Sequence, residues 1–396
     1  MSDRPTVFML VDNPMRSDLR VEREARSLHA HGWKVRLFAM EDPSLPEREL
    51  RDHGMVERSV PRAIISPLSL KYVRARTRFA RMLVAEGARC IHAHDHYCLD
   101  LAVAAKRIDP SITIIYDAHE YLAGWPVHME SPRRIDRLKG GIVWWWCVQR
   151  ERMNLRHCAS IITVSRSLCE EMQRRNGLPT RPVLLRNIPD IPAYIPRSNI
   201  RHDLQIPEHL QVLVHSGNVY HSDERIAMLV RGCLSVDGTY LLFICNTRNR
   251  SKVISVIERE NIMTADRVGF VDFPERHEVL LGMLRACDAG VVHTWQPDWP
   301  SHWLSLPNRI MEYTLCGLPV LATSQPEFIA FQQEFGNCAL YNGERAEDLR
   351  AAIEQLLEQR TALEVNAKHA ATRLSWRSEQ KALIDLYEMH CAGPPA

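Results

Sequence analysis

Runs of apolar residues alternate with amphipathic stretches along the first half of the chain. The apolar runs are continuous, with few polar residues between them, which is typical of parallel strands buried on both faces. We predict strands at 6–11, 34–38, 90–92, 113–116, 160–164 and 183–185, with helical patterns such as 20–30, 99–106 and 167–175 between them. This strand–helix–strand spacing predicts an open parallel sheet with helices on both sides.

A group of prolines interrupts this alternation near the middle of the chain. Pro189, Pro192 and Pro196 lie close together, and proline at this density stops helices and stiffens a linker. The alternation then restarts, with strands expected at 212–215, 240–244, 267–270, 289–292, 320–322 and 339–341. In sheets of this kind, ligands bind outside the carboxyl ends of the strands.

These patterns predict an α/β chain with two Rossmann-like, doubly wound parallel-sheet domains. We expect the first domain at 1–187, a proline-rich linker at 188–200 and the second domain at 201–374. A last helical segment at 375–396 is expected to pack back on the first domain.

Composition narrows the class of protein. The chain has 396 residues, 45% of them hydrophobic and 25% charged, with a formal net charge of +2. This balance is typical of a globular protein and provides no overall charge for binding nucleic acid. The apolar runs are too short for a signal peptide or for a membrane span, which needs about 20 residues. The 11 cysteines include no C-x-x-C pair, so we expect free thiols in a reducing cytoplasm.

Imidazoles and a carboxylate gather at the end of the strand predicted at 90–92, as His92, His94, Asp95 and His96. Alternate residues of a strand point the same way, so a His-x-His pair at a strand end could bind zinc in a hydrolase. No second Cys/His cluster completes such a ligand set in the sequence. Polar side chains lining a binding cleft are the other interpretation, and the residues alone leave both open.

A second polar strand end follows the strand predicted at 113–116. Asp117, His119 and Glu120 could orient a hydroxyl-rich substrate or stabilise charge in a transition state. The alternative is an aspartate helix cap beside a solvated His–Glu pair. This strand should lie next to the strand that precedes His92–His96, which would bring the two polar groups together. The functional interpretation is therefore favoured.

A third candidate lies at 306–322. Pro307 suits the first turn of a helix, and Gly317 and Pro319 would end that helix before a strand. The start of a helix that faces a cleft can bind phosphate through its free N–H groups. Glu312 lies further along the same helix, where its carboxylate could accept hydrogen bonds from ribose hydroxyls. Packing on a sheet would explain the apolar pattern but not this acidic residue.

Six segments in order resemble the nucleotide-sugar-dependent glycosyltransferases of the GT-B fold, particularly family four: 91–96, 116–120, 158–165, 185–189, 306–322 and 375–376. The resemblance extends over about 5–390. It implies two domains facing a central cleft, with the acceptor on the first and a UDP- or GDP-linked sugar on the second. It also implies transfer with retention and no metal or other cofactor, because a helix dipole and Arg225 would neutralise the leaving diphosphate.

The resemblance assigns roles to individual side chains at these strand and helix ends. The implied catalytic residues are His119, Glu120 and Asp95, and the implied acceptor contacts are His94, His96 and Trp125. The implied donor contacts are Gly217, Asn218, Arg225, Arg248, Ser305, Leu306, Asn308, Arg309 and Glu312.

The chain departs from the family pattern on the donor side. Leu304 stands where the family has the first Glu of its E-x7-E motif, and Asn218 stands at the first of two basic positions. Arg225 fills the second basic position one residue out of register. These departures bear on how the donor is oriented.

Two basic segments, 71–81 and 133–157, indicate a partner surface. The first has no acidic residue, and the second carries Trp144, Trp145 and Trp146 among its basic residues. Basic residues beside interfacial tryptophans suit a helix that rests on an anionic membrane. A solvated basic face, with the tryptophans in the core or in an acceptor site, is the alternative.

The sequence therefore predicts a cytoplasmic glycosyltransferase, with peripheral membrane contact as an open question, that moves a sugar to a hydroxyl of a glycan, glycolipid or small metabolite. A zinc hydrolase built on His92, His94 and His96 is the first alternative. The second is a nucleotide-sugar-binding protein without catalysis, which Leu304 would permit.

Overall fold

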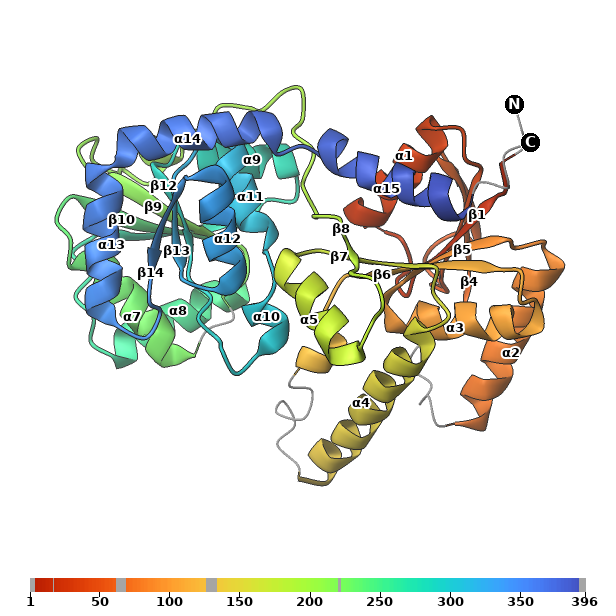
Figure 1. Cartoon of the computed structure of the whole chain (residues 1–396). Coiled ribbons are helices and arrows are strands. Elements are labelled where there is room, and N and C mark those ends of the chain that lie inside the picture. The colour runs from red at the N-terminus through yellow and green to blue at the C-terminus, as the bar shows by residue number, and fades with distance from the viewer. Residues whose placement is uncertain (1–3, 17, 62–68, 126–133, 220–221, 392–396) are drawn as a thin grey trace. The chain divides into compact units, whose positions relative to one another are not determined.

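The computed structural model describes residues 4–16, 18–61, 69–125, 134–219 and 222–391 (Figure 1). The chain divides into two compact units. The first unit comprises Met1–Asn187, Trp299–Ser301 and Glu379–Ala396, and the second comprises Ile188–Asp298 and His302–Ser378. Of the helices within the described ranges, none is both long and apolar enough to span a bilayer.

The first unit is built on an eight-stranded sheet in the order β3-β4-β2-β1-β5-β6-β7-β8. Its strands are β1 (Val7–Leu10), β2 (Val35–Met40), β3 (Arg48–Arg51), β4 (Gly54–Val60), β5 (Cys90–His94), β6 (Thr113–Ala118), β7 (Ser160–Thr163) and β8 (Val183–Leu184). All pairings are parallel except that of β3 with β4. The strands predicted from apolar runs are confirmed, with ends shifted by one or two residues.

Helices cover both faces of this sheet. The unit contains α1 (Leu19–Ala30), α2 (Leu70–Ala85), α3 (Asp95–Ile108), η1 (Leu122–Gly124), α4 (Arg134–Leu155), α5 (Arg166–Asn176) and most of α15 (Trp376–His390). Figure 1 shows α1 and α15 above the sheet and α2, α3 and α4 below it.

Several contacts attach the last helix and the residue after it to the first unit. The His92 imidazole and the Tyr387 hydroxyl are hydrogen-bonded, with Nδ1 and Oη 2.7 Å apart, and the rings of Trp33 and Tyr387 meet edge to face. A disulfide joins Cys391 to Cys90 on β5, with the Cα atoms 6.0 Å apart. The expectation of thiols alone is therefore wrong for this pair, whose separation of 301 residues left no local spacing signal.

The second unit is built on a six-stranded, fully parallel sheet in the order β11-β10-β9-β12-β13-β14. Its strands are β9 (Gln211–Ser216), β10 (Thr239–Cys245), β11 (Val268–Asp272), β12 (Ala289–Val292), β13 (Val320–Thr323) and β14 (Cys338–Tyr341). All six correspond to predicted strands. The helices numbered from here are α6 (Ile200–Asp203), α7 (Asp223–Leu234), α8 (Thr247–Arg259), α9 (His277–Arg285), α10 (Pro300–Trp303), α11 (Asn308–Leu315), α12 (Pro326–Phe335), α13 (Ala346–Glu358) and α14 (Arg360–Arg373).

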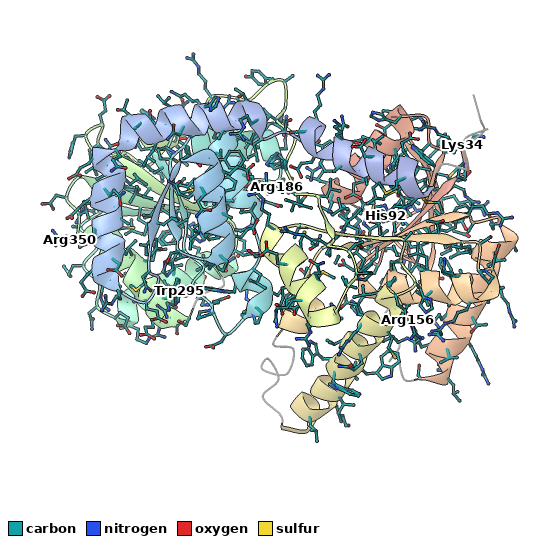
Figure 2. The ribbon with its side chains drawn as sticks, viewed as in Figure 1. Lys34, His92, Arg156, Arg186, Trp295 and Arg350 are labelled. Carbon is teal, nitrogen blue, oxygen red and sulfur yellow. A yellow bond between two sulfur atoms is a disulfide. The ribbon has the colours of Figure 1, made fainter. Side chains whose placement is uncertain are left out.

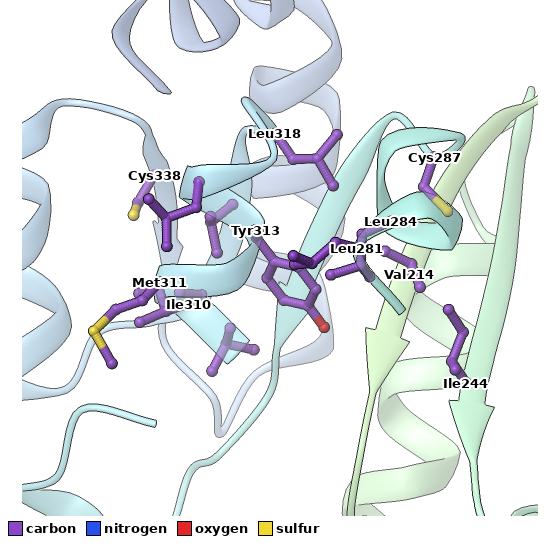
Figure 3. Close-up of a cluster of buried hydrophobic side chains, with 14 of the residues drawn as sticks. Val214, Ile244, Leu281, Leu284, Cys287, Ile310, Met311, Tyr313, Leu318 and Cys338 are labelled. Carbon is purple, nitrogen blue, oxygen red and sulfur yellow. The ribbon is translucent and has the colours of Figure 1, made fainter. Parts of the chain in front are cut away.

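Tyr313 anchors α11 to this second sheet. Its ring points from α11 into the apolar cluster drawn in Figure 3, which also contains Val214 and Leu281. The Tyr313 hydroxyl accepts a hydrogen bond from the backbone N–H of Ser216 at 2.8 Å. Gly290 of β12 leaves room for the ring, because a Cβ there would collide with it. The anchor holds the start of α11 beside the carboxyl end of β9.

Candidate functional site

The carboxyl ends of β5 and β6 bring Asp95 and His119 together. The strands are parallel neighbours, with His94 opposite Asp117. Asp95 Oδ1 accepts a hydrogen bond from the backbone N–H of His119 at 3.1 Å, and Asp95 Oδ2 lies 3.5 Å from His119 Nδ1. Asp95 has a φ of 62°, a left-handed conformation that is uncommon for a non-glycine residue and concentrates at functional sites.

The carboxylates around His119 favour the protonated form of its imidazole. Its Nε2 atom lies 3.1 Å from Asp117 Oδ2 and 3.0 Å from His94 Nδ1. Burial alone would lower the pKa of His119, but attraction to Asp95 and Asp117 outweighs it and raises the pKa to about 10. Burial also raises the pKa of Asp95 to about 7, against the effect of the His119 cation. The pair therefore combines an imidazolium with a carboxyl that titrates near neutrality.

Arg20 of α1 forms an ion pair with Asp117. Its Nε and Nη2 atoms donate to Asp117 Oδ2 and Oδ1 at 2.9 and 2.8 Å, and Nη1 donates to the Leu185 carbonyl at 3.0 Å. Burial on its own would raise the pKa of Asp117, but Arg20 and His119 hold it well below its usual range. Sequence reasoning missed Arg20, although an Arg and Glu24 four residues apart in an otherwise apolar stripe were a signal.

Two of the three histidines of the zinc hypothesis lie in the same buried cluster. His92 and His94 stack at 4.3 Å between ring centres, and ligand atoms of Glu24, His92, His94 and Asp117 all lie within 4.8 Å of one another. His92 is fully buried, below the last helix in Figure 2. These four possible metal ligands do not fit a catalytic zinc centre. Arg20 already pairs with both carboxylates, at 3.1 Å for Glu24 Oε1, and an open ligand position for water or substrate requires solvent access.

The remaining residues predicted for this edge, His96, Glu120 and Trp125, lie around the Asp95–His119 pair. His96 is in the first turn of α3, outside the buried group of possible ligands, and burial lowers its pKa. Glu120 is exposed and hydrogen-bonds the side chain of Trp125, which follows η1; burial raises the pKa of Glu120. Asp12 joins the same edge after β1. Its pKa is raised by burial, and it interacts electrostatically with His119.

The second unit has its own polar edge, at the carboxyl end of β9. Gly217 has a φ of 84°, and a Cβ there would lie 3.7 Å from Arg309 Nη2. Arg309 donates from Nη2 to the carbonyl of Asn218 at 2.9 Å and from Nη1 to His215 Nε2 at 2.8 Å. Burial, and next the Arg309 cation, hold the pKa of His215 well below its usual range. Arg309 is thus fixed across the turn that follows β9.

A small pocket of about 120 Å³ opens beside Arg309. It is lined by Asn218, Thr294, Gln296, His302, Ser305, Pro307 and Arg309. These residues come from the segments after β9 and β12, where the strand order reverses, from α10 and the segment after it, and from the start of α11. This is the switch point at which doubly wound sheets bind ligands. The positive end of the α11 dipole adds attraction for an anion.

Glu312 has a partner within the second unit. His277, at the start of α9, lies with its Nε2 atom 3.1 Å from Glu312 Oε1. The Glu312 side chain is largely buried. One carboxylate oxygen therefore has a neighbouring donor in His277, which the sequence did not indicate.

The other predicted donor residues occupy different positions. Arg225 of α7 donates to the carbonyl of Gly343, after β14, and it does not line the pocket beside Arg309. Arg248 is exposed in the first turn of α8. Asn308 is exposed at the start of α11, whereas Leu306 is buried in the core. Arg309, more than Arg225, is the cation that the structure places with the turn after β9.

Comparison with known proteins agrees with this architecture. The sequence model for Glycosyltransferase Family 4 matches residues 19–190. No curated protein sequence matches the chain.

Several solved structures share the fold over nearly the full length. Sucrose-phosphate synthase from Thermosynechococcus elongatus is 19% identical, with a TM-score of 0.72 and coverage of 97% of this chain and 99% of that one. HepE from Anabaena, solved in complex with UDP, is 16% identical, with a TM-score of 0.68 and coverage of 97% and 100%. WaaG, a glycosyltransferase involved in lipopolysaccharide biosynthesis, is 16% identical, with a TM-score of 0.64 and coverage of 96% and 99%. Residues 19–190 therefore match glycosyltransferase family 4, and the chain as a whole has the GT-B fold of these solved structures.

Proposed function

We propose that the chain transfers a sugar from a UDP- or GDP-linked donor to an acceptor hydroxyl, with the donor on the second unit and the acceptor on the first. The observation that carries this proposal is the fixed position of Arg309 between the turn after β9 and the start of α11. A guanidinium and the positive end of the α11 dipole beside one pocket suit a diphosphate. HepE, which shares the fold, was solved with UDP.

The donor half would work by charge. Negative charge builds on the leaving diphosphate as the sugar bond breaks, and charge-assisted hydrogen bonds from Arg309 strengthen with it. The dipole of α11 adds to this effect. Glu312 would accept hydrogen bonds from the ribose hydroxyls, while His277 occupies one of its oxygens. In this proposal the chain's own cations take the place of a metal ion.

The acceptor half would work through His119 and Asp95. A protonated His119 donates hydrogen bonds and stabilises negative charge, but it cannot take up a proton. Asp95, with a pKa of about 7, is suited to orient the acceptor hydroxyl and to accept a hydrogen bond from it. His96, Glu120 and Trp125 are retained as acceptor-side candidates, whereas the predicted acceptor contact His94 is buried beside His119. Retention of configuration follows in this proposal from the family resemblance.

The proposed acceptors remain a glycan, a glycolipid or a small metabolite, and the proposed compartment remains the cytoplasm. The free cysteines among the described residues support that compartment, although Cys90 and Cys391 do not.

Calorimetry with UDP, GDP and their sugar conjugates tests the donor half. We expect Arg309→Gln to weaken binding of the nucleoside diphosphate by about tenfold or more, the loss of roughly one charge-assisted hydrogen bond. Arg350→Gln, which removes an exposed arginine of α13, is the matched control and should bind the nucleoside diphosphate as tightly as wild type. Equal affinity of Arg309→Gln and wild type would contradict the proposal.

Turnover separates the alternatives. Release of nucleoside diphosphate from a sugar donor by the purified chain, unaffected by a chelator, supports the transferase. Activity that is lost with a chelator and restored by zinc would favour the hydrolase. Donor binding without any turnover would favour a binding protein.

A further inference from the structure

A single buried carboxylate ties together three helices on one face of the first unit. Asp100 of α3 accepts hydrogen bonds from Tyr72 Oη at 2.6 Å and Arg76 Nη1 at 3.0 Å, both on α2. It also accepts from Arg150 Nε at 2.5 Å and Asn154 Nδ2 at 3.2 Å, both on α4. The outward faces of α2 and α4 therefore keep a fixed relation to each other.

The three neighbouring tryptophans of α4 have different environments. Trp144 donates from Nε1 to a backbone carbonyl, that of Leu122, at 3.0 Å. The ring of Trp146 lies 4.9 Å from the Arg150 guanidinium. Trp145 alone of the three is exposed, with 57% of its surface accessible. One tryptophan thus faces outward, and packing on the protein accounts for the other two.

Trp145 belongs to an exposed stripe along α4. Leu138, Ile142 and Trp145 are spaced i, i+4 and i+7 and are all exposed. The same row continues at helical spacing to Arg152 and Arg156, which are also exposed. Figure 2 labels Arg156 at the end of α4 that lies nearer the sheet. The stripe is apolar in the first part of the helix and basic beyond it.

The outward row of α2 repeats this order. Leu70 is exposed at its start, and Arg74, Arg78 and Arg81 follow on the same side. In Figure 1 both α2 and α4 begin at the lower end of the unit and run toward the sheet. The apolar ends of both helices therefore project from the unit, with the arginines behind them.

The described side chains of this surface include little compensating acidic charge, and Asp136 of α4 lies outside them. Residues 70–85 of α2 contain no Asp or Glu. Within residues 138–155 of α4 the acidic residue is Glu151, which is buried and accepts a hydrogen bond from the Tyr116 hydroxyl at 2.5 Å. A positive surface with exposed aliphatic and indole side chains at one end complements an anionic lipid surface. On such a surface Trp lies at the level of the headgroups, and arginines bind the phosphates.

We propose that the outward faces of α2 (residues 70–81) and α4 (residues 138–156), here named the α2–α4 surface, dock on an anionic lipid bilayer. Leu70, Leu138, Ile142 and Trp145 enter the interfacial region. The arginines behind them bind lipid headgroups, each strengthening binding by about fivefold. Docking of this kind is independent of glycosyl transfer, so either proposal can fail without the other.

Sedimentation of the full chain with vesicles tests this docking. We expect the chain to pellet with phosphatidylcholine vesicles that contain phosphatidylglycerol, and not with pure phosphatidylcholine. Raised salt should release it, because salt screens exposed charges. The double substitution Arg74→Gln/Arg78→Gln should weaken binding by about thirtyfold, from about fivefold for each arginine. Trp145→Ser should weaken binding while leaving the salt dependence unchanged.

Matched controls come from α15, which lies outside the α2–α4 surface. Arg377→Gln/Lys381→Gln removes two exposed basic residues, and Met389→Ser removes an exposed apolar one. Both should bind vesicles like wild type, and all variants should keep the wild-type melting temperature and affinity for nucleoside diphosphate. Equal pelleting with neutral vesicles, equal losses in the controls, or no pelleting at low salt would overturn the proposal. So would self-association abolished by Trp145→Ser, because the surface would then bind a second copy of the chain.

Discussion

His119 Nε2 lies 3.1 Å from Asp117 Oδ2, while His119 Nδ1 faces Asp95 Oδ2 at 3.5 Å. Each ring nitrogen therefore has a carboxylate neighbour. This arrangement stabilises the imidazolium despite burial and raises the pKa of His119 to about 10. The same cation also stabilises the fold, because it compensates two carboxylates at the edge of the sheet.

The first prediction concerns stability and pH. The pKa of His119 is raised in the folded state, from 6.5 to about 10. Its stabilising contribution is therefore complete below pH 6.5 and is lost as the pH rises through about 10. We expect His119→Gln to lower the free energy of unfolding most at about pH 6, with the difference from wild type shrinking toward about pH 10. Denaturant unfolding at several pH values measures this difference.

The control for this prediction is His202→Gln, which removes an exposed histidine of the second unit. The free energy of unfolding of this variant should stay close to that of wild type at every pH measured. If the loss of unfolding free energy caused by His119→Gln grew as the pH rises, His119 would be neutral in the folded protein.

The parallel strands could be predicted because each is a buried apolar run, and their carboxyl ends located Asp95 and His119 correctly at one edge. The β3–β4 hairpin was missed because β3 is an exposed edge strand, Arg48–Arg51, with no apolar run to reveal it. Arg20 and Asp117 are 97 residues apart, and their pairing depends on how α1 packs on the sheet. Sequence patterns locate strand ends, but they do not determine which long polar side chains meet there.

The second prediction distinguishes two arginines of the donor unit. Arg309 lines the pocket after β9, whereas Arg225 is directed to the Gly343 carbonyl. We expect Arg225→Gln to weaken binding of nucleoside diphosphate less than Arg309→Gln does, and to lower the melting temperature through the lost hydrogen bond, which stabilises by about 1 kcal/mol. Calorimetry and thermal unfolding of both variants test the order. A larger affinity loss in Arg225→Gln would restore Arg225 as the main phosphate cation.

The third prediction concerns Glu312 and His277, whose Oε1 and Nε2 atoms lie 3.1 Å apart. Glu312→Gln removes the charge that would accept from the ribose, so nucleoside diphosphate should bind about ten- to hundredfold more weakly, as expected for about 1.5–3 kcal/mol. His277→Ala should have a smaller effect, because it frees Glu312 to rotate without removing the carboxylate. His277→Gln, which keeps a donor at similar reach, should recover part of that loss. Unchanged binding of the free nucleoside diphosphate by Glu312→Gln would show that the ribose lies elsewhere.

The fourth prediction concerns Leu304, at the position of the missing first Glu of the family motif. Leu304 is partly buried directly before Ser305, which lines the pocket with His302 and Gln296. A leucine side chain cannot accept a hydrogen bond from a sugar hydroxyl, so sugar recognition would fall to these polar neighbours. Leu304→Glu adds an acceptor and leaves Arg309 and the other residues of α11 unsubstituted. We therefore expect it to change the relative rates with different sugar donors, while the affinity for free nucleoside diphosphate stays within about twofold of wild type.

Leu304→Gln is the matched variant for this last experiment, because it adds hydrogen-bonding capacity without charge. If charge near the diphosphate caused the change in sugar preference, Leu304→Glu would weaken binding of the free nucleoside diphosphate. Leu304→Gln would leave that binding unchanged. If recognition of a hydroxyl is the cause, both variants change sugar preference and neither changes the binding of the diphosphate. Rates with a panel of UDP- and GDP-linked sugars, measured beside calorimetry, decide between the two. An unaltered preference in both variants would mean that the transferred sugar does not reach residue 304.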